Sequence, residues 1–355
     1  MIESIESIHF ENFKALRDST LPLGPCNILV GPNGSGKSTV LRALDILREY
    51  AERSLRQGQS NFGGYTASTP FAHYSELVSA ARRGDGTSAV RLKIKFAGVP
   101  GRAELVFAPN GPGPVGPGHV GTESPEPSER VNDCLAGIAV YNLDPSKIAL
   151  PVALKRDITI DPNGGNLAGV LDGLRDREPE RFEAITEELA RWLPEFDRIL
   201  FDTDDSGKRS IALRTREGRH KIAAASLSQG TLIALTLLTL AYLPQPPTLI
   251  GLEEPDRGLH PWLLRRVQDA IYRLAYPKDC GESRPPVQVI ATTHSPYFLD
   301  LFKNHPEEII VANKVDDNVQ FERLSERPHA REILGDAPVG EIWYSGILGG
   351  VPTEP

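Results

Sequence analysis

The pattern G-x-x-x-x-G-K-[ST] occurs near the amino end of the chain, as Gly31-Pro32-Asn33-Gly34-Ser35-Gly36-Lys37-Ser38. Glycines at these positions allow backbone N–H groups to converge on a phosphate at the start of a helix, whose partial positive charge favours the anion. In this pattern the ammonium group of the lysine reaches the outer phosphates, and the hydroxyl group of the serine holds Mg²⁺. The predicted nucleotide-binding residues are Gly31, Pro32, Asn33, Gly34, Ser35, Gly36, Lys37, Ser38 and Thr39.

A predicted strand and a predicted helix flank this loop. Residues 27–30 form a short apolar run, and apolar side chains recur at helical spacing from Val40 to Leu47. Strand, glycine loop and helix is the order that phosphate binding requires, so we favour it over a turn that only connects two elements.

Two adjacent carboxylates end a second apolar run. Residues 248–252 predict a buried strand, which Glu253 and Glu254 follow. We assign Glu253 to Mg²⁺, directly or through water, and Glu254 to orienting and deprotonating an attacking water. A solvated strand end is the alternative, and the phosphate loop in the same chain favours the catalytic interpretation.

A histidine follows a third apolar run. Residues 287–292 predict a buried strand, and Thr293-His294-Ser295 comes next. His294 could hydrogen-bond the terminal phosphate or the attacking water, whereas the alternative is a histidine satisfied inside a strand-to-helix turn. His260, which precedes Pro261, is interpreted as structural, and the other histidines lack metal-ligand spacing.

A serine and a glycine stand just before the most apolar predicted helix, residues 232–243. The segment 227–231 reads Leu-Ser-Gln-Gly-Thr, which places a hydroxyl group and backbone N–H groups at a helix N-terminus. This predicts a second anion site in the chain. The alternative is an ordinary serine cap with a glycine that permits close packing.

The remaining elements predict an α/β fold. Predicted strands at 248–252 and 287–292 alternate with a helix at 262–275, which indicates a mainly parallel core sheet covered by helices. Antiparallel peripheral hairpins are predicted at 90–107 and 199–213, and two packed helices over 165–193. We expect a single two-lobed chain: a nucleotide-binding lobe of residues 1–108 and 245–355, and a helical lobe of residues 128–244. Residues 109–127, of which eleven of nineteen are Gly or Pro, are expected to form a flexible loop.

Composition indicates an intracellular globular chain. The 355 residues include 39 basic and 47 acidic side chains, and three scattered cysteines support neither a disulfide framework nor a zinc site. The longest uncharged stretch, 222–252, is broken by glycine and prolines, so no membrane span is expected. Acidic residues among the first 30 exclude a signal peptide at the start, and we expect a cytoplasmic protein.

Taken in order, these motifs resemble the ABC-type ATPase heads of the SMC, RecF and OLD families, with Walker A at 31–38, the ABC signature at 227–231 and Walker B at 248–254. A group of compact AAA-type predicted ATPases is still more similar. The shared segments are Asn12-Phe13-Lys14, Asn166-Leu167-Ala168, Ser228-Gln229-Gly230-Thr231-Leu232, the residues from Glu253 to Pro261, and Gly340-Glu341-Ile342-Trp343.

This resemblance implies a P-loop NTPase fold of the ABC head type, with ATP and Mg²⁺ as cofactors. It also implies a head-to-tail homodimer in which Ser228, Gln229, Gly230 and Asp256 of one copy act in trans on the ATP of the other. Lys14 matches a position at which these families often carry a basic residue near the nucleotide. Because both copies would hold the terminal phosphate, its hydrolysis would release the partner.

The chain also departs from these families. No switch-loop glutamine can be placed between Lys37 and Ser228, with Gln57 and Gln59 as candidates, and residues 50–220 lack the heptads of an SMC coiled coil. Only 61 residues follow His294, and their adjacent acidic pairs are Glu307-Glu308 and Asp316-Asp317, so we expect no nuclease domain of the OLD type.

We therefore hypothesise an ATPase whose ATP-bound dimer controls a partner, either DNA or a nuclease, in DNA maintenance or anti-phage defence. The alternatives are the motor subunit of a membrane transporter and a non-hydrolysing ATP-dependent scaffold. Basic side chains at Arg82, Arg83, Lys93 and Lys95 could contact a nucleic-acid backbone, or could simply form solvated faces.

Overall fold

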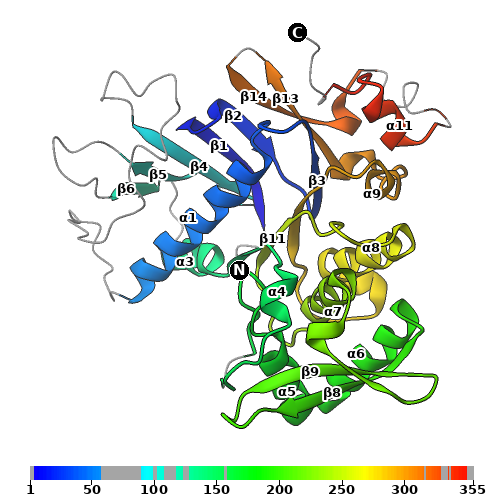
Figure 1. Cartoon of the computed structure of the whole chain (residues 1–355). Helices are drawn as coiled ribbons and strands as arrows, with labels where there is room; N and C mark the ends of the chain where they lie inside the picture. The colour runs from blue at the N-terminus through cyan, green and yellow to red at the C-terminus, as the bar shows by residue number, and fades with distance from the viewer. Residues whose placement is uncertain are drawn as a thin grey trace. The chain divides into compact units, whose positions relative to one another are not determined.

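The computed structural model describes residues 4–56, 89–98, 102–107, 117–122, 128–155, 158–315, 317–328, 335 and 337–349. The chain divides into two compact units: unit 1 contains residues 1–139 and 290–355, and unit 2 contains residues 140–289. Figure 1 shows the elements of each unit. These boundaries differ from the expected lobes, because residues 245–289 lie in unit 2. Within that segment, helix α8 (Pro261–Ala275) packs against the apolar helix α7 (Gln229–Ala241) of the same unit.

Unit 1 contains an antiparallel sheet of five strands in the order β2-β1-β4-β5-β6. The strands are β1 (Ile5–Phe13), β2 (Leu16–Pro22), β4 (Val90–Phe96), β5 (Ala103–Phe107) and β6 (Pro117–Thr122). The side chains of β4 alternate strictly between buried and half-buried, as its alternating sequence predicts. The predicted β4–β5 hairpin is confirmed.

Strand β6 lies inside the segment 109–127 that we expected to be a loop. Its residues pair antiparallel with β5, so the loop prediction is wrong for residues 117–122. Backbone pairing with a neighbouring strand does not depend on side-chain burial, which is why glycine and proline content failed as a guide here. Residues 109–116 and 123–127 lie outside the described residues.

Unit 1 also contains part of a second sheet, with its strands in the order β14-β13-β3-β12. Its members are β3 (Cys26–Val30), β13 (Ile309–Val315), β14 (Asn318–Arg323) and the end of β12 (Gln288–Thr292). β13 pairs with β3 in parallel and with β14 antiparallel. Every residue of β3 is buried, in keeping with a strand covered on both faces. The helices of unit 1 are α1 (Lys37–Arg56), α3 (Ser128–Ala136), which packs on α1, α9 (Pro296–Asp300) and α11 (Val339–Tyr344).

Unit 2 contains β11 (Leu249–Glu253), which lies between the start of β12 and the end of β7 (Ile138–Tyr141). Its helices are α4 (Pro145–Ile148), α5 (Leu167–Arg177), α6 (Pro179–Trp192), α7 (Gln229–Ala241) and α8 (Pro261–Ala275). α7 is buried from Gly230 to Ala241, and it packs against both α6 and α8. A helix that is apolar all round must be enclosed in this way.

A separate antiparallel sheet completes unit 2. It has the order β10-β9-β8, with β8 (Phe196–Thr203), β9 (Arg209–Thr215) and β10 (Lys221–Ala223), and α5 and α6 pack on it (Figure 1). The predicted turn between β8 and β9 is confirmed, since Asp204 Oδ1 accepts hydrogen bonds from the backbone N–H of Ser206 and Lys208 at 2.9 Å each.

These elements confirm the predicted α/β class, with antiparallel hairpins beside a sheet that contains parallel strands. Within the described residues, no helix combines the length and the apolar character needed to cross a bilayer.

Candidate nucleotide-binding site

The glycine-rich loop of unit 1 closes around its own lysine. Lys37 Nζ donates hydrogen bonds to the carbonyl oxygens of Gly31 at 2.7 Å and Pro32 at 2.9 Å, and lies 3.4 Å from Ser35 Oγ. Ser35 N–H also donates to the Pro32 carbonyl, at 3.2 Å. Lys37 is only 6% exposed, so its ammonium group is held inside the loop rather than extended into solvent.

Two glycines of this loop are required by their surroundings. A Cβ atom at Gly31 would lie 2.5 Å from the backbone oxygen of Ala312 on β13. Gly36 has a φ of +84°, and a Cβ atom there would lie 2.8 Å from Leu16 Cδ2. Only glycine fits both positions, so the loop follows the surface of its neighbours closely.

The loop leads into the first turn of α1, where Ser38 is exposed and Thr39 is half-buried. Asn33 and Gly34 at the outer side of the loop are exposed as well. The arrangement therefore offers backbone N–H groups at a helix N-terminus, an ammonium group and a hydroxyl group. This donor set fits a triphosphate with Mg²⁺.

The turn between β1 and β2 lies next to this loop in unit 1. Lys14 occupies the turn with a φ of +50° and a half-buried side chain. Leu16, two residues later, is the side chain nearest to Gly36. The structure thus brings the turn of Lys14 and the end of the glycine-rich loop together, and a role for Lys14 at the nucleotide stays a prediction.

The end of β12 lies beside β3 in the same unit. Thr293 N–H donates to the Leu29 carbonyl at 3.1 Å, and Thr293 is fully buried. Ser295 caps α9, because its Oγ accepts from the Phe298 N–H at 3.2 Å. His294 is exposed between these two fixed residues. Its position at a polar strand end is as predicted, and its proposed contact with phosphate stays a prediction.

The two carboxylates of unit 2 stand at the end of β11 in different backbone conformations. Glu253 ends the strand, whereas Glu254 has a φ of +45°. A positive φ is uncommon for any residue except glycine and costs about 1–3 kcal/mol, and such residues concentrate at functional sites. The left-handed conformation of Glu254 sets it apart from the extended strand that Glu253 ends, and the two assigned roles stay predictions.

Asn142 is a residue that the sequence analysis missed. It follows β7, and its Nδ2 donates a hydrogen bond to Glu253 Oε2 at 2.8 Å. Arg257 links the same two segments, since its Nη2 donates to the Leu143 carbonyl at 3.0 Å. The signal available in the sequence was an asparagine directly after the apolar run 138–141, the same pattern that identified Glu253.

The Ser-Gln-Gly turn of unit 2 caps α7. Ser228 Oγ accepts a hydrogen bond from the Thr231 N–H at 3.0 Å, which confirms the capping role. Ser228 and Gln229 are exposed, whereas Gly230 is buried, and a Cβ atom there would lie 2.8 Å from the Gly258 carbonyl oxygen. The structure therefore packs this turn against the turn that follows Glu254 and contains the half-buried Asp256.

His260 has the structural role that the sequence indicated. Its Nδ1 accepts a hydrogen bond from the Trp262 N–H at 3.2 Å and caps α8. Across the described part of the chain, no group of three or more His, Cys, Asp or Glu residues could hold a metal ion.

The basic residues of β4 are engaged in ion pairs. Lys93 pairs with Glu11, and Lys95 Nζ lies 2.8 Å from Glu6 Oε1. Arg91 Nη1 lies 3.2 Å from the other oxygen of Glu11. These pairs favour the interpretation of this face as a solvated one. Arg82, Arg83, Gln57 and Gln59 lie outside the described residues.

Comparison with known families agrees with this organisation. The family model described as "AAA ATPase domain" matches residues 4–139, and the model described as "AAA domain, putative AbiEii toxin, Type IV TA system" matches residues 139–300. The first match contains the glycine-rich loop, and the second contains Ser228, the Glu253-Glu254 pair and His294.

A curated relative and two solved structures are also similar. An OLD nuclease from Thermus scotoductus is 26% identical over 327 residues, which are 84% of this chain and 60% of that protein. The crystal structure of an SMC head bound to the C-winged helix domain of ScpA covers 90% of this chain and 97% of that one, with a TM-score of 0.58 and 18% identity. An SMC head domain from Thermotoga maritima covers 90% and 98%, with a TM-score of 0.47 and 16% identity.

The chain thus spans 60% of the length of its curated relative, and its likeness to the SMC head concerns the fold. Two AAA-domain models and the OLD relative thus show that the chain is similar to AAA-type ATPases of the SMC/RecF/OLD-like kind, and the SMC head shows that it shares their fold.

Proposed function

We propose that this protein binds ATP with Mg²⁺, hydrolyses it, and uses the ATP-bound state to form a head-to-tail homodimer that controls a partner. The observation that supports ATP binding most directly is the glycine-rich loop of residues 31–38, folded around the buried ammonium group of Lys37 at the start of α1. On phosphate binding, this ammonium group would exchange its carbonyl partners for phosphate oxygens, which are stronger acceptors.

Each predicted side chain has a defined role in this proposal. The backbone of residues 31–39 and the side chain of Lys37 bind the phosphates, and Lys14 contributes positive charge from the adjacent turn. Ser38 and Glu253 supply oxygen atoms to Mg²⁺, whose chemistry is to neutralise charge on the phosphates. Glu254 orients and deprotonates the attacking water, and His294 hydrogen-bonds the water or the terminal phosphate.

Asn142 acts as a positioning residue in this scheme. Its amide group occupies one oxygen of Glu253 at 2.8 Å, which fixes the direction of the other oxygen. Partners of this kind are typical of metal-binding carboxylates, because they hold the ligand in one orientation.

The proposed dimer uses the exposed cap of α7. Ser228 and Gln229 are accessible, and the Ser228 hydroxyl and neighbouring N–H groups form a helix N-terminus that favours an anion. A second copy of the chain would present the phosphates of its bound ATP to this cap. Asp256, in the turn packed against Gly230, would lie at the same interface.

The proposed partner is DNA or a nuclease, in DNA maintenance or anti-phage defence. This part of the proposal rests on the relative, which is named an OLD nuclease and of which the chain spans 60%.

The decisive experiment compares wild type with Glu254→Gln and with the exposed control Glu183→Gln. We expect the Glu254 variant to bind ATP, to lose phosphate release, and to accumulate as a dimer on size-exclusion chromatography with ATP. Wild-type turnover in this variant would remove Glu254 from the role of general base. ATP-dependent dimers in a wild-type protein that releases no phosphate would instead identify a non-hydrolysing scaffold.

A further inference from the structure

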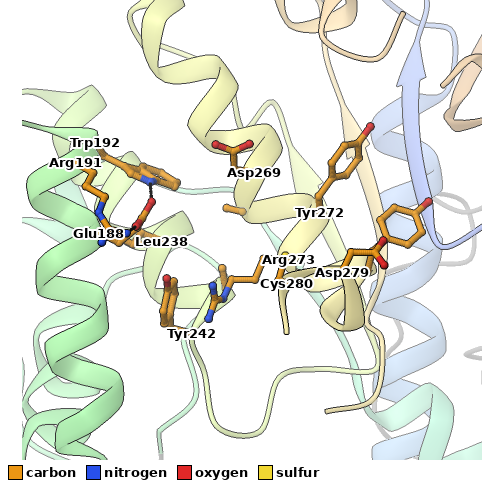
Figure 2. Close-up of a pocket in the computed structure, with 13 residues that line it drawn as sticks. Glu188, Arg191, Trp192, Leu238, Tyr242, Asp269, Tyr272, Arg273, Asp279 and Cys280 are labelled. Atoms are coloured by element: carbon orange, nitrogen blue, oxygen red, sulfur yellow. Dashed lines mark hydrogen bonds and ion pairs between the residues drawn. The ribbon is translucent and has the colours of Figure 1, made fainter. Parts of the chain in front are cut away.

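A pocket of about 420 Å³ lies in unit 2, and Figure 2 shows its walls. Glu188 and Trp192 of α6 stand on one side, and Asp269 and Arg273 of α8 stand on the other. The described residues that line it include none of residues 228–230 or 253–256. The pocket is therefore distinct from the proposed ATP-binding residues, and its volume is typical of sites for small ligands.

Three helices end at this pocket. α6 ends at Trp192, α7 at Ala241 and α8 at Ala275, and each lines the pocket with residues from its carboxyl-terminal half or from its cap. The last carbonyl groups of a helix carry partial negative charge, and a cation near one such end is stabilised by about 0.3–1 kcal/mol. Three ends at one pocket favour a positively charged occupant.

Two of the three carboxylates that line the pocket, Asp269 and Asp279, form no ion pair with an arginine of the lining. Glu188, Asp269 and Asp279 line the pocket. Of the two lining arginines, Arg191 is paired with Glu188 at 2.6 Å, and Arg273 is paired with Glu282. Asp279 forms no ion pair with any residue that the structure describes.

Asp269 forms its ion pair with an arginine outside the pocket lining. Its partner Arg266, at 3.4 Å, is outside the lining, and its guanidinium group also lies 5.7 Å from the ring centroid of Trp262. Burial raises the pKa of the Asp269 carboxyl group above its ordinary value, despite the charge of Arg266. An additional positive charge within the pocket would favour the ionised form of this group.

Aromatic rings complete the walls. Trp192, Tyr242, Tyr272 and Tyr276 line the pocket, and the guanidinium carbon of Arg273 lies 3.9 Å from the Tyr242 ring centroid. Aromatic faces attract organic cations in this way. The edge-to-face pair of Tyr272 and Tyr276, with ring centroids 5.7 Å apart, adds apolar surface.

The protein already places its own guanidinium groups on this region. Arg181 donates to the Tyr242 carbonyl at 3.4 Å, and Arg284 donates to the Arg273 carbonyl at 2.5 Å. These two carbonyls belong to the ends of α7 and α8. The chain's own guanidinium groups thus occupy the Tyr242 ring and these two carbonyls at the border of the pocket, which shows that these surroundings accept guanidinium groups and leaves Asp269 and Asp279 for an added cation.

We propose that this pocket binds an organic cation whose head is a guanidinium or a primary ammonium group. The cation belongs either to a free small molecule or to an arginine or lysine side chain of a partner protein. The head lies among the carboxylates and helix ends, and the alkyl part lies against the aromatic rings.

Isothermal titration calorimetry on the full chain tests this with n-butylguanidinium and its uncharged analogue n-butylurea. We expect the guanidinium compound to bind and the urea to bind at least tenfold more weakly. The double variant Asp269→Asn/Asp279→Asn should also bind the cation at least tenfold more weakly, whereas the exposed control Asp205→Asn should match wild type. The Asp269 side chain is 53% exposed and Asp279 is exposed, so the double variant should fold.

The proposal is overturned if the guanidinium compound does not bind or if the urea binds equally well. It is also overturned if the double variant binds the cation with unchanged affinity. Putrescine stands for a free small molecule, and a short arginine-containing peptide amide stands for a side chain of a partner protein. The one that binds more tightly identifies the source of the cation. Titration of Lys37→Ala should give wild-type affinity for the cation. Failure of ATP binding and failure of this site are therefore separate results.

Discussion

Asn142 Nδ2 donates a hydrogen bond to Glu253 Oε2 at 2.8 Å and ties the end of β7 to the end of β11. Replacing Asn142 with alanine removes this hydrogen bond, which helps to orient the carboxylate toward the proposed metal position. Loss of such a partner typically reduces metal affinity by about 10- to 100-fold. We therefore expect Asn142→Ala to need correspondingly more Mg²⁺ for half-maximal phosphate release, with ATP binding retained.

The control for this experiment is Asn313→Ala, on β13 of unit 1. Equal Mg²⁺ dependence in wild type and Asn142→Ala would assign the hydrogen bond to folding alone. Urea denaturation of both variants shows whether lost stability accounts for lost turnover.

Lys37→Ala should strongly weaken nucleotide binding. The ammonium group is held by the carbonyl groups of Gly31 and Pro32, at the place where the loop would receive phosphate. A hydrogen bond to a charged group contributes about 1.5–3 kcal/mol, so we expect affinity for ATP to fall by roughly 10- to 100-fold or more. Fluorescence of a labelled ATP analogue measures the dissociation constant. The control is Lys208→Ala, which changes an exposed turn residue. An unchanged dissociation constant would contradict the assigned role.

Ser228→Arg should prevent the ATP-dependent dimer while leaving ATP binding by the monomer intact. Ser228 is exposed at the cap of α7, so a long charged side chain can be accommodated in one copy but obstructs a second copy. Light scattering in the presence of ATP compares the dimer fraction of Glu254→Gln with that of the double variant Glu254→Gln/Ser228→Arg. Dimers of equal stability in both proteins would show that the cap does not face the partner copy. Ser226→Arg, two residues earlier and also exposed, tests whether any arginine in this segment has the same effect.

Glu11 should contribute stability that depends on pH. Burial alone would raise the pKa of its carboxyl group, but hydrogen bonds and charges from Lys93 and Arg91 lower it below its ordinary value. A lowered pKa in the folded state means that the contribution is present above the unfolded pKa of about 4.3 and is lost as pH falls through the folded value.

We therefore expect Glu11→Gln to lower the free energy of unfolding by about 0.5–1 kcal/mol at neutral pH, a modest effect because the pair is partly solvated. Urea denaturation between neutral and acidic pH should show the difference shrinking as Glu11 becomes protonated in wild type. A difference that stays constant with pH would show that packing, and not charge, is responsible. The exposed substitution Glu187→Gln should give no such trend.

Local patterns predicted the elements that carry the motifs. The glycine spacing at 31–36 and the apolar period after it identified β3, the loop and α1, because each depends on residues within a few turns of chain. The extended apolar runs likewise identified β11, β12 and α7. Short-range signals were sufficient there, since burial of an element leaves a continuous apolar run in its sequence.

Contacts between distant residues could not be predicted in the same way. Asn142 and Glu253 are 111 residues apart, and nothing local to either indicates the other. β13 pairs in parallel with β3, and the paired residues Ile309 and Ile28 are far apart in the sequence; this strand was not predicted at all. The positive φ of Glu254 was also missed, because the usual signal for it is a glycine and this position has none.

That backbone conformation restricts position 254 independently of its carboxylate. β-branched residues tolerate a φ of +45° poorly, whereas glycine and asparagine adopt it at little cost. In a saturation library at this codon, clones sorted only for stable expression should be enriched in glycine and asparagine. Clones sorted for turnover should retain glutamate, so the two enrichment profiles would separate what the main chain demands from what the chemistry demands.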